Sequence, residues 1–282
     1  MLFASLMKTT TKVWLTAATL GAAGAAVLVS RALAARQLRQ DVRDLFAGVI
    51  DAAPRHYHEA QLIGLPAPVQ RYFRRVLPDG QPYLRGVRLR HTGQFKTDLD
   101  KGWVDIAGEQ YIMADPPAFI WQGTSRQFTA RDEFVDGHGR LRVRLLGAVP
   151  IVDGTGPHFD QGELLRWLSE CAFLPTALLP SERLQWSAID EHSARLTLTY
   201  GGQTLQYLFS FDHQGELVQC ETQRYQGENQ LLPWRGRFSD YQQLHGVRVP
   251  TLLEGMWVLD GQERPYARFT VQELHYEPLE PF

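Results

Sequence analysis

The chain has 282 residues, of which 44% are hydrophobic and 21% charged, and its formal net charge at pH 7 is -2. These proportions exclude a globally disordered chain, and 24 Gly without a Gly-X-Y period exclude a collagen-like protein. Residues 31–90 hold eleven Arg against five acidic residues, net +6, whereas residues 91–282 hold 16 basic against 26 acidic residues, net -10. A basic amino-terminal region on an acidic body favours an anionic partner, either nucleic acid or a membrane surface.

The first predicted element is an apolar segment. Residues 13–30 carry no charge, and with its flanks such a run can span a hydrocarbon core of about 30 Å. We therefore expect a short flank over 1–12 and a transmembrane anchor over 13–30. The alternative is a cleaved signal peptide, because Ala32-Leu33-Ala34 has the small-x-small form of a cleavage site. The length of the run and the position of Arg31 before that site favour the anchor.

The charges that flank this segment leave its orientation open. Four Arg follow within about fifteen residues, the range in which flanking charges count, against two Lys and the amino group before it. This difference of one charge leans toward a cytoplasmic body but is too small to decide. We expect a single-pass protein of the bacterial inner membrane with a periplasmic body, and a cytoplasmic body is the alternative.

Helical periodicity follows the anchor. We expect a juxtamembrane helix and linker over 31–60 and one β domain over 61–282. Residues 36–52 predict a helix because apolar residues recur at spacings of three and four. Residues 65–77 predict a second amphipathic helix, which opens with prolines suited to a first turn.

A third helix is predicted from Asp160. Asp160 and Glu163 have the spacing of a capping box, in which the two side chains would satisfy backbone N–H groups of the first turn.

Most of the remaining chain alternates apolar and polar residues with the period of a strand. Short turns between these segments require antiparallel pairing, because parallel strands need long crossovers. The predicted fold is mainly β (α+β): a single curved antiparallel sheet or half-barrel of about 11–12 strands with about three helices against its concave side, plus the transmembrane helix. The predicted strands are 85–95, 103–113, 118–123, 128–135, 140–146, 184–190, 194–200, 204–212, 217–225, 234–242, 247–259 and 266–276.

Several segments between residues 65 and 258 carry a family pattern. They begin with Leu65-Pro66-Ala67-Pro68-Val69 and Val87-Arg88-Leu89-Arg90-His91, and they include Gly162-Glu163-Leu164-Leu165-Arg166-Trp167 and Pro233-Trp234-Arg235-Gly236. With these segments the chain resembles a family of uncharacterised bacterial membrane-anchored proteins. Its strand order also resembles the half-barrel of periplasmic lipoprotein carriers, and this resemblance implies a concave apolar sheet that holds acyl chains.

No catalytic motif is present: the sequence lacks G-x-S-x-G, P-loop, H-E-x-x-H and C-x-x-C patterns. We therefore expect no cofactor, no metal and no catalytic residue. The aromatic side chains on the strands suit either a core or a lipid-sized cavity. Arg166 could bind an anion at the mouth of a pocket or form a solvated pair with Glu170. The candidate ligand-binding residues are Trp121, Arg166, Trp167, Glu170, Trp234, Tyr241, Glu254 and Trp257.

Glu254 lies in an apolar strand and needs a partner if it is buried. Arg235 and Arg237 are the candidates, and solvent is the alternative. The two cysteines, Cys171 and Cys220, favour buried free thiols over one disulfide.

The basic helix over 65–77 contributes Arg71, Arg74 and Arg75. We expect these side chains to contact anionic headgroups and not nucleic acid, because the body is acidic, the chain is tethered and no recognition motif occurs. A solvated basic face is the alternative.

The sequence as a whole predicts a membrane-anchored protein that binds a hydrophobic or lipid ligand near the bilayer and is not an enzyme. The alternatives are a lipid-modifying hydrolase with an unidentified site and a structural or partner-binding membrane protein. A cavity enclosed by the sheet would favour ligand binding, and converging titratable groups in it would favour the hydrolase.

Overall fold

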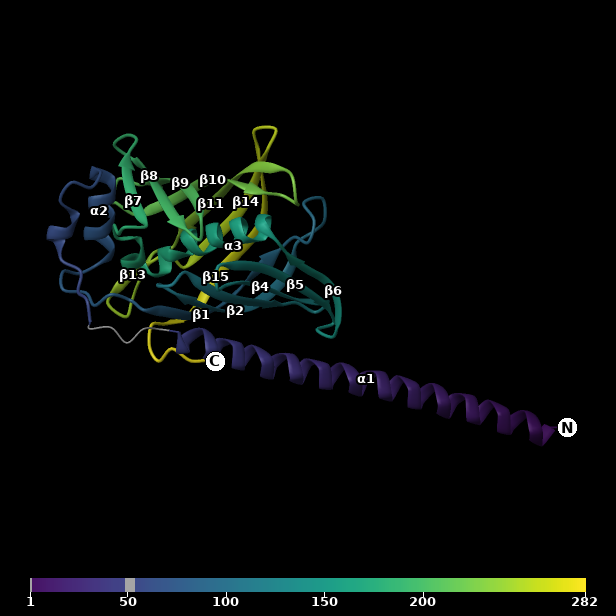
Figure 1. Cartoon of the computed structure of the whole chain (residues 1–282). Helices are drawn as coiled ribbons and strands as arrows, with labels where there is room; N and C mark the ends of the chain where they lie inside the picture. The colour runs from purple at the N-terminus through teal and green to yellow at the C-terminus, as the bar shows by residue number, and fades with distance from the viewer. Residues whose placement is uncertain (1, 49–53) are drawn as a thin grey trace.

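A curled antiparallel sheet wraps around one helix and carries another on its outer face (Figure 1). The computed structural model describes the backbone of residues 2–48 and 54–282 and the side chains of residues 24–48 and 54–282. The predicted class, mainly β with three α-helices, is confirmed for this part of the chain. The helices are α1 (Leu2–Ala47), α2 (Ala67–Val76) and α3 (Pro157–Glu170), with 3-10 turns η1 (Glu59–Leu62), η2 (Cys171–Phe173) and η3 (Pro175–Leu178).

Thirteen strands form the main sheet, in the order β6-β5-β4-β3-β2-β1-β15-β14-β11-β10-β9-β8-β7, and two more form a small separate pair, β12-β13. The strands are β1 (Gly86–Phe95), β2 (Val104–Met113), β3 (Ala118–Thr124), β4 (Phe128–Val135), β5 (His138–Leu145), β6 (Val149–Thr155), β7 (Leu184–Ala188), β8 (Ser193–Tyr200), β9 (Gln203–Phe211), β10 (Leu217–Tyr225), β11 (Leu231–Ser239), β12 (Gln242–Leu244), β13 (Val247–Val249), β14 (Leu252–Leu259) and β15 (Gln262–His275).

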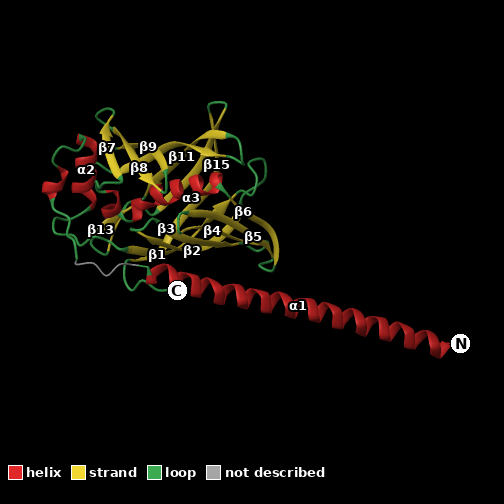
Figure 2. Cartoon of the chain, in the orientation of Figure 1, coloured by secondary structure: helices red, strands yellow, loops and turns green. Residues whose placement is uncertain are grey.

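The order of the strands explains why α3 lies inside the curl. The chain builds one half of the sheet outward from β1 to the edge strand β6, and it then re-enters the sheet at the opposite edge, β7. Helix α3 is the main element of the connection between these edges, and it crosses the trough of the sheet (Figure 2). The pairing of β1 with β15 joins the two halves.

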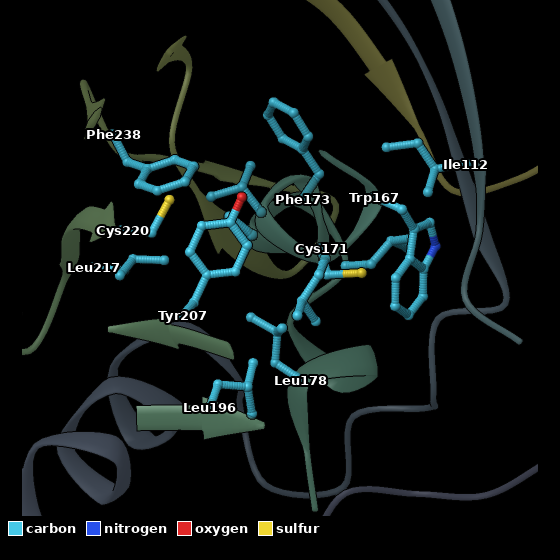
Figure 3. Packing of buried hydrophobic residues seen from close by; sticks show 14 of the residues in the cluster. Ile112, Trp167, Cys171, Phe173, Leu178, Leu196, Tyr207, Leu217, Cys220 and Phe238 are labelled. Atoms are coloured by element: carbon cyan, nitrogen blue, oxygen red, sulfur yellow. The ribbon is translucent and has the colours of Figure 1, made fainter. Parts of the chain in front are cut away.

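The trough side of α3 forms the main core. Leu164, Leu165 and Leu168 have almost no exposed surface and pack on the concave face of the sheet. Figure 3 shows this core, with Cys171 following α3 and Cys220 on β10. Both cysteines are buried free thiols, as the sequence favoured.

Helix α1 packs on the opposite, convex face. Its predicted apolar stripe is confirmed: Leu38, Val42, Leu45 and Phe46 are buried in a second cluster with residues of β2 and β3. Asp41 fixes the contact through an ion pair between its Oδ2 and Nη1 of Arg131 on β4, 2.7 Å apart. The expectation that the helices lie on the concave side is therefore wrong for α1.

The predicted anchor and juxtamembrane helix belong to the same continuous helix, α1. The part of the predicted anchor before residue 24 lies outside the side chains that the structure describes. In the described part of the chain, none of the helices has the length and apolar character needed to cross a membrane.

The structure also corrects the strand boundaries. Strand β6 was not predicted because Pro150 and Gly154 disfavour a strand, but β6 is an edge strand, where proline is tolerated. The predicted strands 234–242 and 247–259 are each divided, since the chain turns at Asp240 with a φ of 53° and gives the separate β12-β13 pair.

The predicted capping box of α3 is wrong. The helix begins at Pro157, whose missing N–H suits a first turn. Asp160 instead accepts a hydrogen bond from the backbone N–H of Gly139 at 2.7 Å, and Glu163 is buried. Gly139 permits this close approach, because a Cβ there would lie 2.2 Å from the carbonyl oxygen of Phe159.

We predict that Leu168→Ala lowers the free energy of unfolding by about 2–5 kcal/mol, because it leaves a void between α3 and the sheet. Denaturant unfolding of the full-length protein, followed by Trp fluorescence, measures this change. The matched control Gln185→Ala, at an exposed position of β7, should stay within about 0.5 kcal/mol of the parent. An equal effect of both changes would contradict the packing role of α3.

Candidate functional site

A cavity of about 570 Å³ remains between α3 and the concave face of the sheet. It exists because α3 fills only part of the trough. Its wall is largely apolar and includes the aromatic side chains of Trp121 from β3, Trp234 from β11 and Phe269 from β15. Other apolar lining residues are Phe95, Ile106, Phe128, Ala130, Leu141, Val143, Leu145, Ile151, Val152, Phe238, Leu253, Tyr266 and Ala267.

Charged side chains line the cavity where α3 faces it. Glu163, Arg166 and Glu170 are spaced by three and four residues, so they share one face of the helix. Asp132 on β4 and Arg224 on β10 complete this group, which we call the α3 charge cluster. Two further charged residues, Arg237 on β11 and Glu254 on β14, also line the cavity, and each pairs with an oppositely charged side chain.

Arg166 is the ion-paired centre of the cluster. Its Nε lies 3.0 Å from Oε1 of Glu170, and its Nη1 binds Oδ2 of Asp132. The guanidinium also lies 4.8 Å from the centroid of the Trp121 ring. The predicted pair of Arg166 with Glu170 is present, but it is largely buried and not solvated. The guanidinium of Arg166 already binds two protein carboxylates, so it is not free to bind an anion as the other alternative expected.

Arg224 has no carboxylate partner among the described residues. Its Nη2 donates to the carbonyl oxygen of Gly162 at 3.0 Å, and its guanidinium lies 5.0 Å from the centroid of Trp234. Its Nε is buried without a hydrogen-bond partner in the described part of the chain. Arginine stays charged in proteins, so Arg224 presents a positive charge that no carboxylate of the described residues contacts directly.

Glu163 is the second under-satisfied member of the cluster. It is only 7% exposed, and its Oε2 has no hydrogen-bond partner among the described residues. Burial, and next the neighbouring charge of Asp132, raise the pKa of Glu163 to about 8. Glu163 is therefore mostly protonated at neutral pH. Burial also raises the pKa of Asp132, which the charge of Arg166 partly offsets.

Hydrogen bonds inside the protein hold the aromatic walls in place. Trp121 Nε1 donates to Nε2 of His91 at 2.7 Å, and Trp234 Nε1 donates to the hydroxyl of Tyr266 at 3.0 Å. Burial lowers the pKa of His91 to about 3, so the imidazole is neutral and can accept this bond. The two indole rings therefore present fixed apolar faces to the cavity.

Five of the eight predicted ligand-binding residues line the cavity: Trp121, Arg166, Glu170, Trp234 and Glu254. Glu254 pairs with Nε of Arg268 at 2.8 Å, which corrects the expectation of Arg235 or Arg237 as its partner.

The other three predicted residues lie outside the cavity. Trp167 is buried and donates to the carbonyl oxygen of Met113 at 2.8 Å, and the hydroxyl of Tyr241 donates to the carbonyl oxygen of Leu217 at 2.8 Å. Trp257 stacks beside Tyr266, with ring centroids 6.4 Å apart.

Asp132, Glu163 and Arg224 were not predicted as site residues. Asp132 could have been identified from the sequence, because it is the polar residue on the face of β4 that otherwise carries Phe128, Ala130 and Phe134. Glu163 was interpreted as a cap. Arg224 stands in a strand with no clear alternation, so no pattern identifies it.

The predicted membrane-contact residues lie on α2, away from the cavity lining. Arg74 pairs with Glu59, Arg75 with Glu216, and Arg71 donates to the carbonyl oxygen of Glu191. Figure 1 shows α2 at the end of the molecule opposite the N-terminal half of α1. Their contact with headgroups stays a prediction.

The fold and site define a curled-sheet protein with an apolar cavity beneath a crossing helix. The chain belongs to the family of unknown function DUF6544, whose pattern matches residues 55–269. This confirms the family resemblance seen in the sequence. None of the curated proteins matches the chain.

Solved structures with a similar fold include the lipoprotein-sorting class. A LolA superfamily protein from Nitrosomonas europaea is 10% identical, with a TM-score of 0.43, over 75% of this chain and 93% of that one. A DUF1329 family protein from Desulfovibrio piger is 8% identical, with a TM-score of 0.42, over 75% and 92%. An outer membrane lipoprotein-sorting protein domain from Vibrio parahaemolyticus is 9% identical, with a TM-score of 0.38, over 74% and 91%.

We predict that Glu163→Gln flattens the pH dependence of stability. Folding raises the pKa from 4.5 to about 8, so between these values the folded protein holds a proton that the unfolded chain has lost. The contribution of Glu163 to the free energy of unfolding should therefore fall as pH rises from 4.5 to about 8 and then level off. The lowered pKa of His91 acts in the opposite sense below pH 6.5, so the fall in the parent should be clearest between pH 6.5 and 8. The variant should lack this fall, whose size is a few kcal/mol.

Denaturant titrations at pH 5, 6, 7, 8 and 9 measure this difference. Gln161→Ala on the same helix removes no titratable group and should retain the parent's pH dependence. A Glu163→Gln profile parallel to that of the parent would show that Glu163 ionises normally in the fold.

Proposed function

We propose that this protein binds a hydrophobic or lipid ligand in the cavity, beside a bilayer. The main support for this proposal is the cavity. Protein interiors rarely keep voids larger than a water molecule, because the lining loses dispersion contacts. A space of about 570 Å³ with an apolar wall has the size and character of a small-molecule site. It also disfavours a purely structural role, for which a closed core would serve better.

The rim of the cavity supports entry from a lipid phase. The hairpin of β5 and β6 exposes several large apolar side chains, and some of them also line the cavity. Several large exposed apolar side chains on one hairpin favour a membrane or protein contact there. We call these residues the apolar rim: Leu145, Leu146, Val149, Ile151 and Val152.

Helix α1 passes directly beside the apolar rim. A Cβ placed on Gly147 would lie 3.0 Å from Nε of Arg31. Arg31 follows immediately on the proposed anchor over 13–30, and the nearby residues Leu28 and Val29 are also exposed. An anchor at this place would bring the rim to the bilayer surface. We propose that residues 13–30 cross the inner membrane once and that the body lies in the periplasm.

The α3 charge cluster favours a second candidate function, a lipid-modifying hydrolase. Glu163 and Asp132 converge in the cavity, and Glu163 has the raised pKa that suits a general acid or base. The cavity-lining Ser169 donates its hydroxyl to the carbonyl oxygen of Arg166, so it is not poised as a nucleophile. Release of p-nitrophenol from acyl esters by the parent, lost in Glu163→Gln, would establish this candidate over simple binding.

We predict that Ala130→Trp abolishes lipid labelling in the cavity. Ala130 lines the cavity on β4, and an indole there would fill part of the space. Cells that express the full-length protein are fed a photoreactive, clickable fatty acid and irradiated, and the labelled peptides are mapped by mass spectrometry. The parent should be labelled on cavity-lining peptides, and the variant should lose most of this label.

The matched control is Ala107→Trp, which adds the same indole to an exposed position on β2. It should keep the parent's labelling. Equal labelling of all three proteins, or label only outside the cavity, would refute the proposed function.

A further inference from the structure

We infer that Glu163 and Arg224 form a head-group subsite, and that the ligand is a single-chain amphiphile whose carboxylate lies inward against α3 while its tail extends toward the apolar rim. This inference rests on the proposed function and specifies its ligand.

The first step is the balance of charge in the cluster. Arg166 takes both nearby carboxylates, since it binds Asp132 and Glu170 together. Arg224 is left with a backbone carbonyl and an aromatic ring as its contacts. No carboxylate of the described residues lies within ion-pair distance of Arg224, although the charges of Asp132 and Glu163 act on it from further away. An anionic ligand group in the cavity would give Arg224 the direct ion pair that it lacks in the described chain.

The second step is the position of Glu163 relative to this charge. Arg224 binds the carbonyl oxygen of Gly162, the residue directly before Glu163, so the two side chains meet at the same part of α3. Both line the cavity, and each holds one buried polar atom without a hydrogen-bond partner. The terminal torsion of a Glu side chain is soft, so its carboxyl can turn toward a ligand at little cost.

The third step concerns the chemistry of the head group. At neutral pH Glu163 is mostly protonated and offers an O–H donor, and Arg224 offers N–H donors. Two convergent donors fit a group that only accepts, and a carboxylate accepts at two oxygens. An ammonium head would meet the positive charge of Arg224, and protonated Glu163 would offer it only a neutral acceptor in place of a carboxylate. The subsite therefore selects an acid over an amine.

The fourth step fixes the size and direction of the ligand. If a methylene group takes about the 30 Å³ that one water molecule takes in the liquid, the cavity of about 570 Å³ matches one acyl chain of ordinary length. Glu163 and Arg224 meet at α3, whereas the exposed rim of Leu145, Ile151 and Val152 is apolar. The head must then lie inward and the tail toward the rim.

The experiment uses the full-length protein in phosphatidylcholine nanodiscs and two photoreactive fatty acids. One carries the diazirine close to the carboxyl group, and the other carries it at the end of the chain. The first should label peptides of α3 and β10, and the second should label the β5–β6 hairpin. The reverse pattern would overturn the inferred orientation.

The head-group contact is tested with Arg224→Gln and with a photoreactive fatty alcohol of equal length. Removing a charged hydrogen-bond donor should reduce labelling by the acid about tenfold, while labelling by the neutral alcohol persists and reports that the cavity is intact. Arg264→Gln is the matched control, because Arg264 is not among the residues that line the cavity and pairs with Asp100 at 2.7 Å. It should leave labelling by the acid unchanged.

These outcomes separate the two proposals. If neither the acid nor the alcohol labels the cavity of the parent, the proposed function fails. If both label it and Arg224→Gln weakens neither, ligand binding stands and the head-group subsite is refuted. A single-chain phosphate that displaces the acid probe at lower concentration than a fatty acid would refute the carboxylate assignment.

Discussion

The structure depends on one constraint: α3 must cross the trough of a curled sheet in order to join its two edge strands. A helix placed there needs an apolar face for the core, which Leu164, Leu165 and Leu168 supply. Its remaining face carries charge into a region with little water, where unpaired ions are unstable. The ion pairs of Arg166 with Asp132 and Glu170 neutralise most of that charge. The cavity is the space left on this charged side of α3. The connection that places α3 in the trough therefore also creates the site.

This origin gives the cavity an unusual polarity. In most soluble domains the surface is polar and the interior apolar. Here the deep wall on α3 carries charge, and the exposed rim on β5 and β6 is apolar. Such a site suits an amphiphile taken from a lipid phase, because the chain passes an apolar rim and the head meets donors inside.

Periodicity in the sequence was sufficient for most elements, because burial on one face of a strand or helix leaves a regular pattern. It failed where another constraint dominated. Edge strand β6 tolerates Pro150, and the start of α3 follows Pro157 in place of the expected cap at Asp160. The aromatic walls were foreseeable from strand residues such as Trp121. The partners of the charged residues were not, since Asp132 and Arg224 reach Arg166 and Gly162 only through the curl of the sheet.

Strand β4 holds two helices through adjacent residues that point to opposite faces. Arg131 binds Asp41 of α1 on the convex side, and Asp132 binds Arg166 of α3 on the concave side. A slip of the strand by one residue would exchange the two faces. It would turn an arginine into the cavity and an aspartate toward α1, breaking both ion pairs at once. The order of Arg131 and Asp132 along β4 therefore favours one register of the strand, because neither helix can form its ion pair with a strand that is shifted by one residue.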